Sequence, residues 1–183
     1  MELRKIDAAT DKAVLKKVKH LYHAAFPKEE RIPWPIVRLN ALRKDINLIA
    51  FLDADTFCGF TYSVTCGDLH FLLFFAVAED LRSKGYGSAI LSLLKETYGT
   101  VVLNIEPFVD DAPNLPERKH RYGFYRHNGF FDTGYHVWEV GGMFRVLSTK
   151  SELDVKPYQE LFLKLTMGIW KVKVLKAEGP LYE

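Results

Sequence analysis

Several features that define other protein classes are scarce in this sequence of 183 residues. Only two cysteines occur, Cys58 and Cys66, and their spacing fits neither a Cys-x-x-Cys metal site nor a disulfide scaffold. The longest uninterrupted apolar run, 71–78, is much shorter than the roughly 20 residues that cross a bilayer. The first residues are charged and lack the apolar stretch of a signal peptide. We therefore expect a cytoplasmic protein with two buried free thiols and no membrane partner.

An excess of charge of one sign is also missing. The chain has 25 Lys and Arg against 23 Asp and Glu, a net charge of +2. Proteins that neutralise nucleic-acid phosphates need clustered basic residues in excess, so this balance argues against a nucleic-acid partner. This overall charge balance is still compatible with a local site that binds an anion. The hydrophobic share of 48% and the charged share of 26% are typical of a folded domain.

The sequence contains no internal repeat, low-complexity tract or interdomain linker. Its length is close to the roughly 150 residues of one average domain. We expect a single domain over residues 1–183, with a core of about 3–149 and a C-terminal extension of about 150–183.

Helical periodicity marks the N-terminal part. Apolar residues recur at helical spacing over 12–26, and Pro27 is a stop signal. A second helical segment follows, with Ile36, Leu39 and Leu42 on one side.

The period then changes to that of strands. Three strands joined by tight turns, which predict an antiparallel meander, cover 46–52, 56–65 and 69–78. A glycine-containing loop over 79–87, a helix and a strand over 100–106 follow. Strand, loop, helix and strand in this order predict a crossover between parallel neighbours.

The remaining pattern predicts further elements of both kinds. They are a helix over 118–128, a hairpin of 130–140 and 143–147 that turns at Gly141-Gly142, a helix over 156–165 and a strand-like stretch over 169–175. The fold class that we expect is α/β. A single mixed, mostly antiparallel sheet would contain one parallel βαβ crossover and carry helices on both faces.

The loop after the third meander strand has the properties of an anion site. Backbone N–H groups at a helix N-terminus lack intrahelical partners and lie at the positive end of the helix dipole. Gly85 and Gly87 would let a ligand approach the backbone closely, and Arg82 and Lys84 add positive charge. The alternative is a solvated turn that begins a helix.

Two nucleotide-binding fingerprints fail in this loop. A dinucleotide loop would need glycine at position 90, where Ile90 stands. A phosphate-binding loop of the G-x-x-x-x-G-K-[ST] type would need a second glycine before Lys-Ser or Lys-Thr.

Two motifs give the chain a resemblance to a known superfamily. Arg82-Ser83-Lys84-Gly85-Tyr86-Gly87 fits Arg/Gln-x-x-Gly-x-Gly/Ala, and Phe124-Tyr125-Arg126-His127-Asn128-Gly129-Phe130 fits Phe/Leu-Tyr-x-x-x-Gly-Phe. In this order, with a strand between them, the motifs resemble those of the GNAT (Gcn5-related) N-acetyltransferase superfamily. The resemblance covers about Leu3 to Val146, and the tail beyond Thr149 lies outside it.

The resemblance implies that acetyl-CoA binds as a co-substrate. Its pantetheine arm would pair with the strand that ends at Val77, as an added strand does, and its pyrophosphate would lie on the glycine-containing loop. The residues implied to bind it are Ala76, Val77, Arg82, Ser83, Lys84, Gly85, Tyr86, Gly87 and Ser88. Tyr125 aligns with the tyrosine that protonates the departing thiolate, the alternative being a packing role. Where many members have asparagine, seven residues earlier, this chain has Arg118.

The acceptor side of the reaction needs a base, because an amine attacks only when neutral and its pKa lies above 7. Glu106, at the end of the second parallel strand, is our candidate base, and a solvated glutamate before Pro107 is the alternative. In the superfamily, the loop between the first two helices borders the acceptor pocket. The candidate substrate-binding residues there are Phe26, Glu29, Glu30, Arg31 and Trp34.

These inferences predict an N-acetyltransferase that moves an acetyl group from acetyl-CoA to a primary amine, by direct attack in a ternary complex. The acceptor would be a small-molecule or peptide amine. The alternative is a non-catalytic module that binds CoA or acyl-CoA for sensing or assembly. No metal site is predicted, since His20 and His23 have ligand spacing but no third ligand is recognisable. The tail is a candidate for an edge strand or a homodimer contact.

Overall fold

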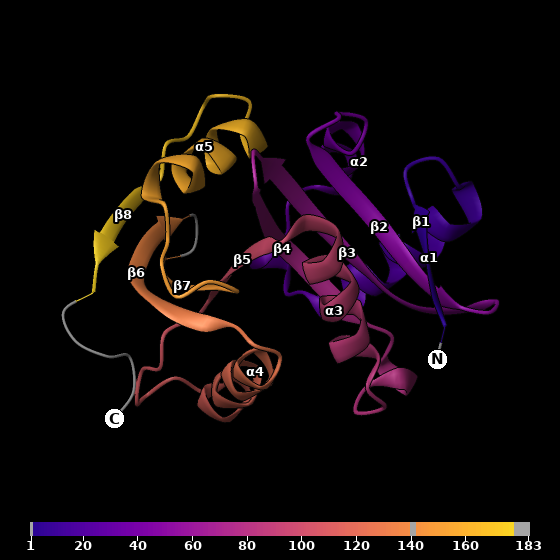
Figure 1. Cartoon of the computed structure of the whole chain (residues 1–183). Coiled ribbons are helices and arrows are strands. Elements are labelled where there is room, and N and C mark those ends of the chain that lie inside the picture. The colour runs from indigo at the N-terminus through magenta and orange to yellow at the C-terminus, as the bar shows by residue number, and fades with distance from the viewer. Residues whose placement is uncertain (1, 140–141, 178–183) are drawn as a thin grey trace.

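One mixed sheet organises the chain (Figure 1). Within residues 2–139 and 142–177, which the computed structural model describes, eight strands follow the order β1-β2-β3-β4-β5-β7-β6-β8. They are β1 (Leu3–Asp7), β2 (Ile46–Asp53), β3 (Thr56–Cys66), β4 (Leu69–Val77), β5 (Thr100–Ile105), β6 (Phe131–Glu139), β7 (Gly142–Ser148) and β8 (Lys173–Lys176). β4 and β5 are parallel, and the other neighbouring pairs are antiparallel.

Helices cover both faces of this sheet, and each layer has its own core. They are α1 (Lys12–Ala25), α2 (Trp34–Asn40), α3 (Tyr86–Tyr98), α4 (Leu115–His127) and α5 (Val155–Leu165). The larger core, with Val18, Val37 and Phe162, lies under α1, α2 and α5. The smaller core, with Leu91 and Phe130, lies under α3 and α4. The predicted fold class is therefore confirmed.

Local sequence explains where α1 begins and ends. The Asp11 carboxylate accepts hydrogen bonds from the backbone N–H groups of Ala13 (2.9 Å) and Val14 (3.0 Å), so it caps the first turn. The helix ends at Ala25, two residues before Pro27, which cannot continue the hydrogen-bond pattern.

The orientation of α2 differs from what its apolar pattern suggests. Its buried residues are Val37 and Asn40. Ile36, Leu39 and Leu42 are exposed, by 43%, 63% and 72%. The helix has only seven residues, and its contact with the sheet is set by the Val37 side, so the predicted apolar side faces solvent.

β4 and β5 separate soon after they meet. Three residue pairs join them, from Leu69 opposite Thr100 to Phe71 opposite Val102. β4 then continues to Val77, while the other edge of β5 pairs with β7. The carboxyl ends of the two parallel strands therefore border an opening in the sheet.

The C-terminal extension packs onto the same sheet. α5 lies over β3 and β4, where Tyr158, Leu161 and Phe162 are buried in the larger core. β8 pairs with β6 and forms one edge of the sheet (Figure 1), which confirms the edge-strand alternative, although β8 is shorter than the predicted stretch. Gly141 of the predicted hairpin turn lies outside the described residues.

Candidate active site

The last residues of β4 present free backbone groups to the opening. Ala78 N–H donates to Cys58 O on β3 at 2.9 Å. Hydrogen-bonding groups alternate in direction along a strand, so the N–H and C=O of Val77 point to the other side, toward β5. There, this part of β4 pairs with none of the described strands. Val77 can thus accept an added strand, whereas the backbone groups of Ala76 point toward β3.

Gly59 allows β3 to approach β4 closely at this point. It pairs with Val77. A Cβ at Gly59 would overlap with the Ala76 carbonyl oxygen and would lie 3.1 Å from Val77 Cα. The path of the strand that borders the opening therefore depends on a glycine in the neighbouring strand.

The glycine-containing loop has a left-handed backbone and an uncapped helix start. Ser83 has φ 60° and Gly85 has φ 86°. None of the described side chains caps α3, and its first backbone bond runs from Ala89 N to Gly85 O at 3.1 Å. The N–H groups of Tyr86, Gly87 and Ser88 therefore have no intrahelical acceptors, which is the arrangement that binds phosphate.

Side chains around this loop take different directions. Arg82 and Lys84 are exposed, beside the free amides. The Tyr86 hydroxyl donates to Asp53 Oδ2 at 2.9 Å and so fixes the loop to β2, leaving its amide for a ligand. Gly87 lies against α4, since a Cβ there would come within 3.0 Å of Phe124 Cζ. The two predicted motifs thus meet in space.

Tyr125 lies on α4, between two aromatic rings. Its ring centroid is 5.3 Å from that of Phe124 and 5.6 Å from that of Phe130, both edge-on. Burial raises the pKa of Tyr125 to about 12, so its hydroxyl stays protonated at neutral pH. Among the described residues, no protein group forms a hydrogen bond with this hydroxyl, which leaves it available to a ligand.

Glu106 directly follows β5 and is held by arginines of α4. Arg118 Nη2 lies 2.8 Å from Glu106 Oε1, and Arg121 forms an ion pair with Oε2. Asn114 Nδ2 also donates to Oε1 at 3.4 Å. Both carboxylate oxygens of Glu106 are therefore occupied by arginine side chains of α4. Its role as a base stays a prediction.

Arg118 also organises the loop before α4. Its Nε donates to Asn114 Oδ1 and its Nη1 to Pro107 O, both at 2.8 Å. The residue that departs from the superfamily pattern therefore joins the end of β5 to the start of α4.

The loop between α1 and α2 lies beside the end of β5. Burial raises the pKa of the Glu30 carboxyl, and the nearby negative charge of Glu106 raises it further. The Phe26 ring is 4.9 Å from that of Phe74 on β4, between centroids. Of the predicted substrate-binding residues, the structure therefore brings Phe26 and Glu30 close to the strands at the opening.

The other three predicted substrate-binding residues are Glu29, Arg31 and Trp34, the first residue of α2. An Arg31 guanidinium nitrogen meets His23 Nδ1, and the Trp34 ring is 5.7 Å from that of Tyr22. Glu29 is exposed.

A polar cluster between β5, β6 and α5 was missed by sequence reasoning. The Tyr158 hydroxyl donates to Asn104 Oδ1 at 2.8 Å, and Asn104 Nδ2 donates to Glu139 Oε1. The sequence did contain one signal for this cluster. Because side chains alternate between the two sides of a strand, Glu139 lies on the same side of β6 as the buried Val137.

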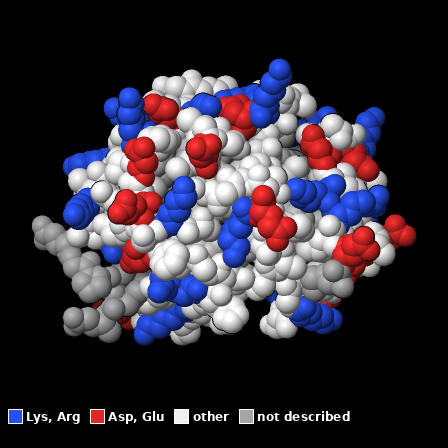
Figure 2. All heavy atoms as spheres, in the orientation of Figure 1, with Lys and Arg blue, Asp and Glu red and all other residues white. Residues whose placement is uncertain are grey.

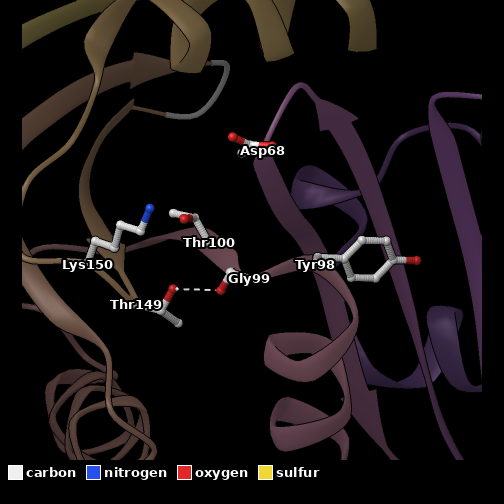
Figure 3. Close-up of a pocket in the computed structure, with 6 residues that line it drawn as sticks. All are labelled: Asp68, Tyr98, Gly99, Thr100, Thr149 and Lys150. Atoms are coloured by element: carbon white, nitrogen blue, oxygen red, sulfur yellow. Dashed lines mark hydrogen bonds between the residues drawn. The ribbon is translucent and has the colours of Figure 1, made fainter.

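Two hollows are found in the described part of the molecule. One, of about 430 Å³, is at the amino ends of β4 and β5 (Figure 3), where Asp68 and Lys150 reach into it and the Tyr98 ring points away. The other, of about 470 Å³, lies between α1 and the end of β4 and is lined by His20 and Phe57 among others. Neither contains Tyr125, Glu106 or the loop over 82–88.

The surface has no dominant charge on the face seen in Figure 2, where basic and acidic side chains alternate. Among the described residues, no group of three His, Cys, Asp or Glu could hold a metal ion. Cys58 and Cys66 are free and buried, as predicted. None of the described helices combines the length and apolarity needed to cross a membrane.

Comparison with known proteins identifies the fold. No family model and no curated protein matches the sequence. A Bacteroides thetaiotaomicron protein assigned to the GNAT family of acetyltransferases superposes with a TM-score of 0.71 at 22% identity, over 93% of this chain and 100% of its own. An aminoglycoside 6'-N-acetyltransferase in complex with coenzyme A gives 0.65 at 15% identity, over 84% and 100%.

A third similar structure, the PaiA N-acetyltransferase of Thermoplasma acidophilum in complex with coenzyme A, gives a TM-score of 0.56 at 16% identity, over 82% and 99%. The chain therefore has the acyl-CoA N-acyltransferase fold of the GNAT superfamily. The Bacteroides match necessarily includes part of the segment after residue 149, so the extension has a counterpart in that protein.

Proposed function

We propose that this protein is a GNAT N-acetyltransferase, which moves the acetyl group of acetyl-CoA to a primary amine by direct attack in a ternary complex. The observation that carries the proposal is the opening between β4 and β5, with the free backbone groups of Val77 on one side and the uncapped start of α3 beside it. An extended pantetheine arm and a pyrophosphate need these two features side by side.

The residues at the opening fit acetyl-CoA. Val77 would pair with the pantetheine arm, and the amides of 85–88 would bind the pyrophosphate, with Arg82 and Lys84 adding charge. When bound, acetyl-CoA supplies a thioester, whose carbonyl carbon is electrophilic. The proposed acceptor is a small-molecule or peptide amine.

Tyr125 is proposed to stabilise the leaving thiolate. Its raised pKa keeps the hydroxyl protonated. Because a thiol has a much lower pKa, of about 8.5, the hydroxyl would act mainly as a hydrogen-bond donor to the thiolate, and complete proton transfer would be uphill.

A non-catalytic CoA sensor is the second candidate function, and the ion pairs on Glu106 favour it, because they occupy the predicted base. Thermal unfolding and thiol release separate the candidates. Acetyl-CoA at 100 times its Kd should stabilise the fold by about 2.7 kcal/mol, or roughly 5 to 11 °C. No shift contradicts both functions. A shift without thiol release, across a panel of amines and peptides, supports the sensor.

A further inference from the structure

The three polar side chains between α5 and β6 form a connected chain. Tyr158 donates to Asn104, and Asn104 donates to Glu139. Tyr158 is fully buried and Glu139 is partly buried. Among the described residues, no Lys or Arg forms an ion pair with Glu139. A carboxylate in apolar surroundings without a cation costs stability, unless a cation arrives from outside.

The strand register places this cluster beside the opening. Asn104 lies two residues beyond Val102, the last residue of β5 that pairs with β4. Asn104 is opposite Val146 of β7, and Glu139 is opposite Gly142, four residues nearer the start of β7. The Glu139 carboxylate accepts a hydrogen bond from Asn104 across this strand. Asn104 shares its side of β5 with Val102, which belongs to the larger core under α5, because residues two apart in a strand point the same way.

We propose that Glu139 takes up the proton that a cationic amine acceptor loses before it attacks, and that Tyr158 and Asn104 position its carboxylate. This inference rests on the acetyltransferase function proposed above and names the group that prepares its acceptor. Tyr158 belongs to the C-terminal extension, so the inference also gives α5 a part in the site.

The proton transfers balance in a simple sequence. The ammonium group of the acceptor gives one proton to the Glu139 carboxylate and becomes a neutral amine. The nitrogen lone pair forms a bond to the acetyl carbon, the C–S bond breaks, and sulfur leaves with the bonding electrons as a thiolate. The nitrogen then gives its second proton to the thiolate, which yields amide and thiol, and Glu139 returns its proton to solvent.

The electrostatics of the cluster suit this role. Burial raises the pKa of Glu139 to about 7, and the hydrogen bond from Asn104 opposes the shift. A group with this pKa exists in both protonation states at neutral pH, as a general base should. Burial and the charge of Glu139 raise the pKa of Tyr158 well above its usual value, so its hydroxyl remains a donor.

The Tyr158 hydroxyl also sets the orientation of the Asn104 amide. Because it donates to Oδ1, it turns Nδ2 toward Glu139. Glu106 differs from Glu139, since arginines occupy both of its oxygens. The charge of Glu139 raises the pKa of Tyr158 on α5, whereas the charge of Glu106 raises the pKa of Glu30.

The test is thiol release from acetyl-CoA with spermidine, tyramine and a peptide with N-terminal alanine, measured from pH 5 to 9. Glu139→Gln keeps the size of the side chain and a hydrogen bond to Asn104, but cannot take up a proton. We expect its kcat to fall about 10²-fold and the inflection near pH 7 to disappear. Tyr158→Phe should move the inflection to higher pH, since the Asn104 amide can then turn away. Glu152→Gln, on an exposed residue before α5, is the control and should match the wild type.

Thermal unfolding shows whether Glu139→Gln is folded and whether burial raises the pKa of Glu139 in the folded protein. The folded pKa of Glu139 lies above the unfolded value of about 4.3, so its ionisation destabilises the folded protein as pH rises through this interval. Glu139→Gln should therefore melt above the wild type at pH 8, and the difference should shrink as pH falls toward about 4. A variant that is inactive because it is misfolded would melt below the wild type.

Two outcomes overturn the inference and are distinguishable. If the wild type releases thiol and Glu139→Gln does so at the same rate with the same pH profile, Glu139 is not the base, and the acetyltransferase function stands. If the wild type releases no thiol with any of the amines, the acetyltransferase function fails, and this inference fails with it.

Discussion

Two glycine-to-alanine substitutions should move stability in opposite directions, and the structure gives the reason. Gly59→Ala places a Cβ against the Ala76 carbonyl and 3.1 Å from Val77 Cα, both of which are backbone atoms. A backbone atom cannot move away by changing rotamer, so β3 and β4 must separate. Overpacking of this kind costs about 1–3 kcal/mol, and for a chain of this length the Tm should fall by roughly 2 to 12 °C.

Gly123→Ala is the matched control. Gly123 lies inside α4 and has no positive φ, and none of the described residues comes within 4 Å of the position that an alanine Cβ would occupy. Alanine is favoured over glycine in a helix by about 0.5–1 kcal/mol, so the Tm should rise by roughly 1 to 4 °C.

The assay is thermal unfolding of both variants, with and without acetyl-CoA. Gly59→Ala should also reduce the stabilisation by acetyl-CoA, because Val77 is the proposed partner of the pantetheine arm. Gly123→Ala should keep that stabilisation. An unchanged or raised Tm for Gly59→Ala would refute the argument that Gly59 sets the position of the strand at the opening.

Three further predictions concern the candidate site and the sheet beside it. Tyr125→Phe should lower turnover about 10²-fold. The Tm and the acetyl-CoA Kd should stay unchanged, because the hydroxyl has no hydrogen-bond partner among the described residues. Turnover equal to that of the wild type would show that Tyr125 takes no part in the chemistry. Arg82→Ala and Lys84→Ala should each weaken acetyl-CoA binding, measured by calorimetry, by about 1 kcal/mol or less, since both are exposed. This loss should shrink in high salt, and an equal loss at all salt concentrations would contradict direct charge pairing. Asp132→Asn removes the carboxylate that lies 2.7 Å from the guanidinium of Arg145, a side chain that is only 2% exposed. Leaving this buried charge without its partner costs about 3–5 kcal/mol, so the Tm should fall by roughly 6 to 20 °C. A Tm within 2 °C of the wild type would contradict this prediction.

Much of the fold could be predicted because its elements have local signals. Asp11 and Pro27 mark the limits of α1, and the change from helical to strand periodicity locates the meander. The orientation of α2 could not be predicted in this way. Both of its sides carry apolar residues, and contact with the sheet decides that Val37 is buried and Leu39 exposed.

In the candidate site, too, features that depend on adjacent residues could be predicted, and contacts between distant segments could not. The loop around Gly85 is a short segment whose backbone and charge can be read from adjacent residues, and the structure gives it the expected uncapped helix start. The ion pairs of Glu106 come from α4, which begins nine residues after it. Spacing within a strand cannot reveal them.

The sequence alone therefore determined the α/β sheet with its crossover, the glycine-containing loop before α3, and the resemblance to the GNAT superfamily, because each rests on residues close together in the chain. Tertiary structure alone decided where β4 and β5 part, which carboxylates have cations beside them, and that Tyr158 of the extension meets Asn104 and Glu139. Those contacts join residues 35 and 54 positions apart. They depend on the order of strands in the sheet, and no local pattern specifies that order.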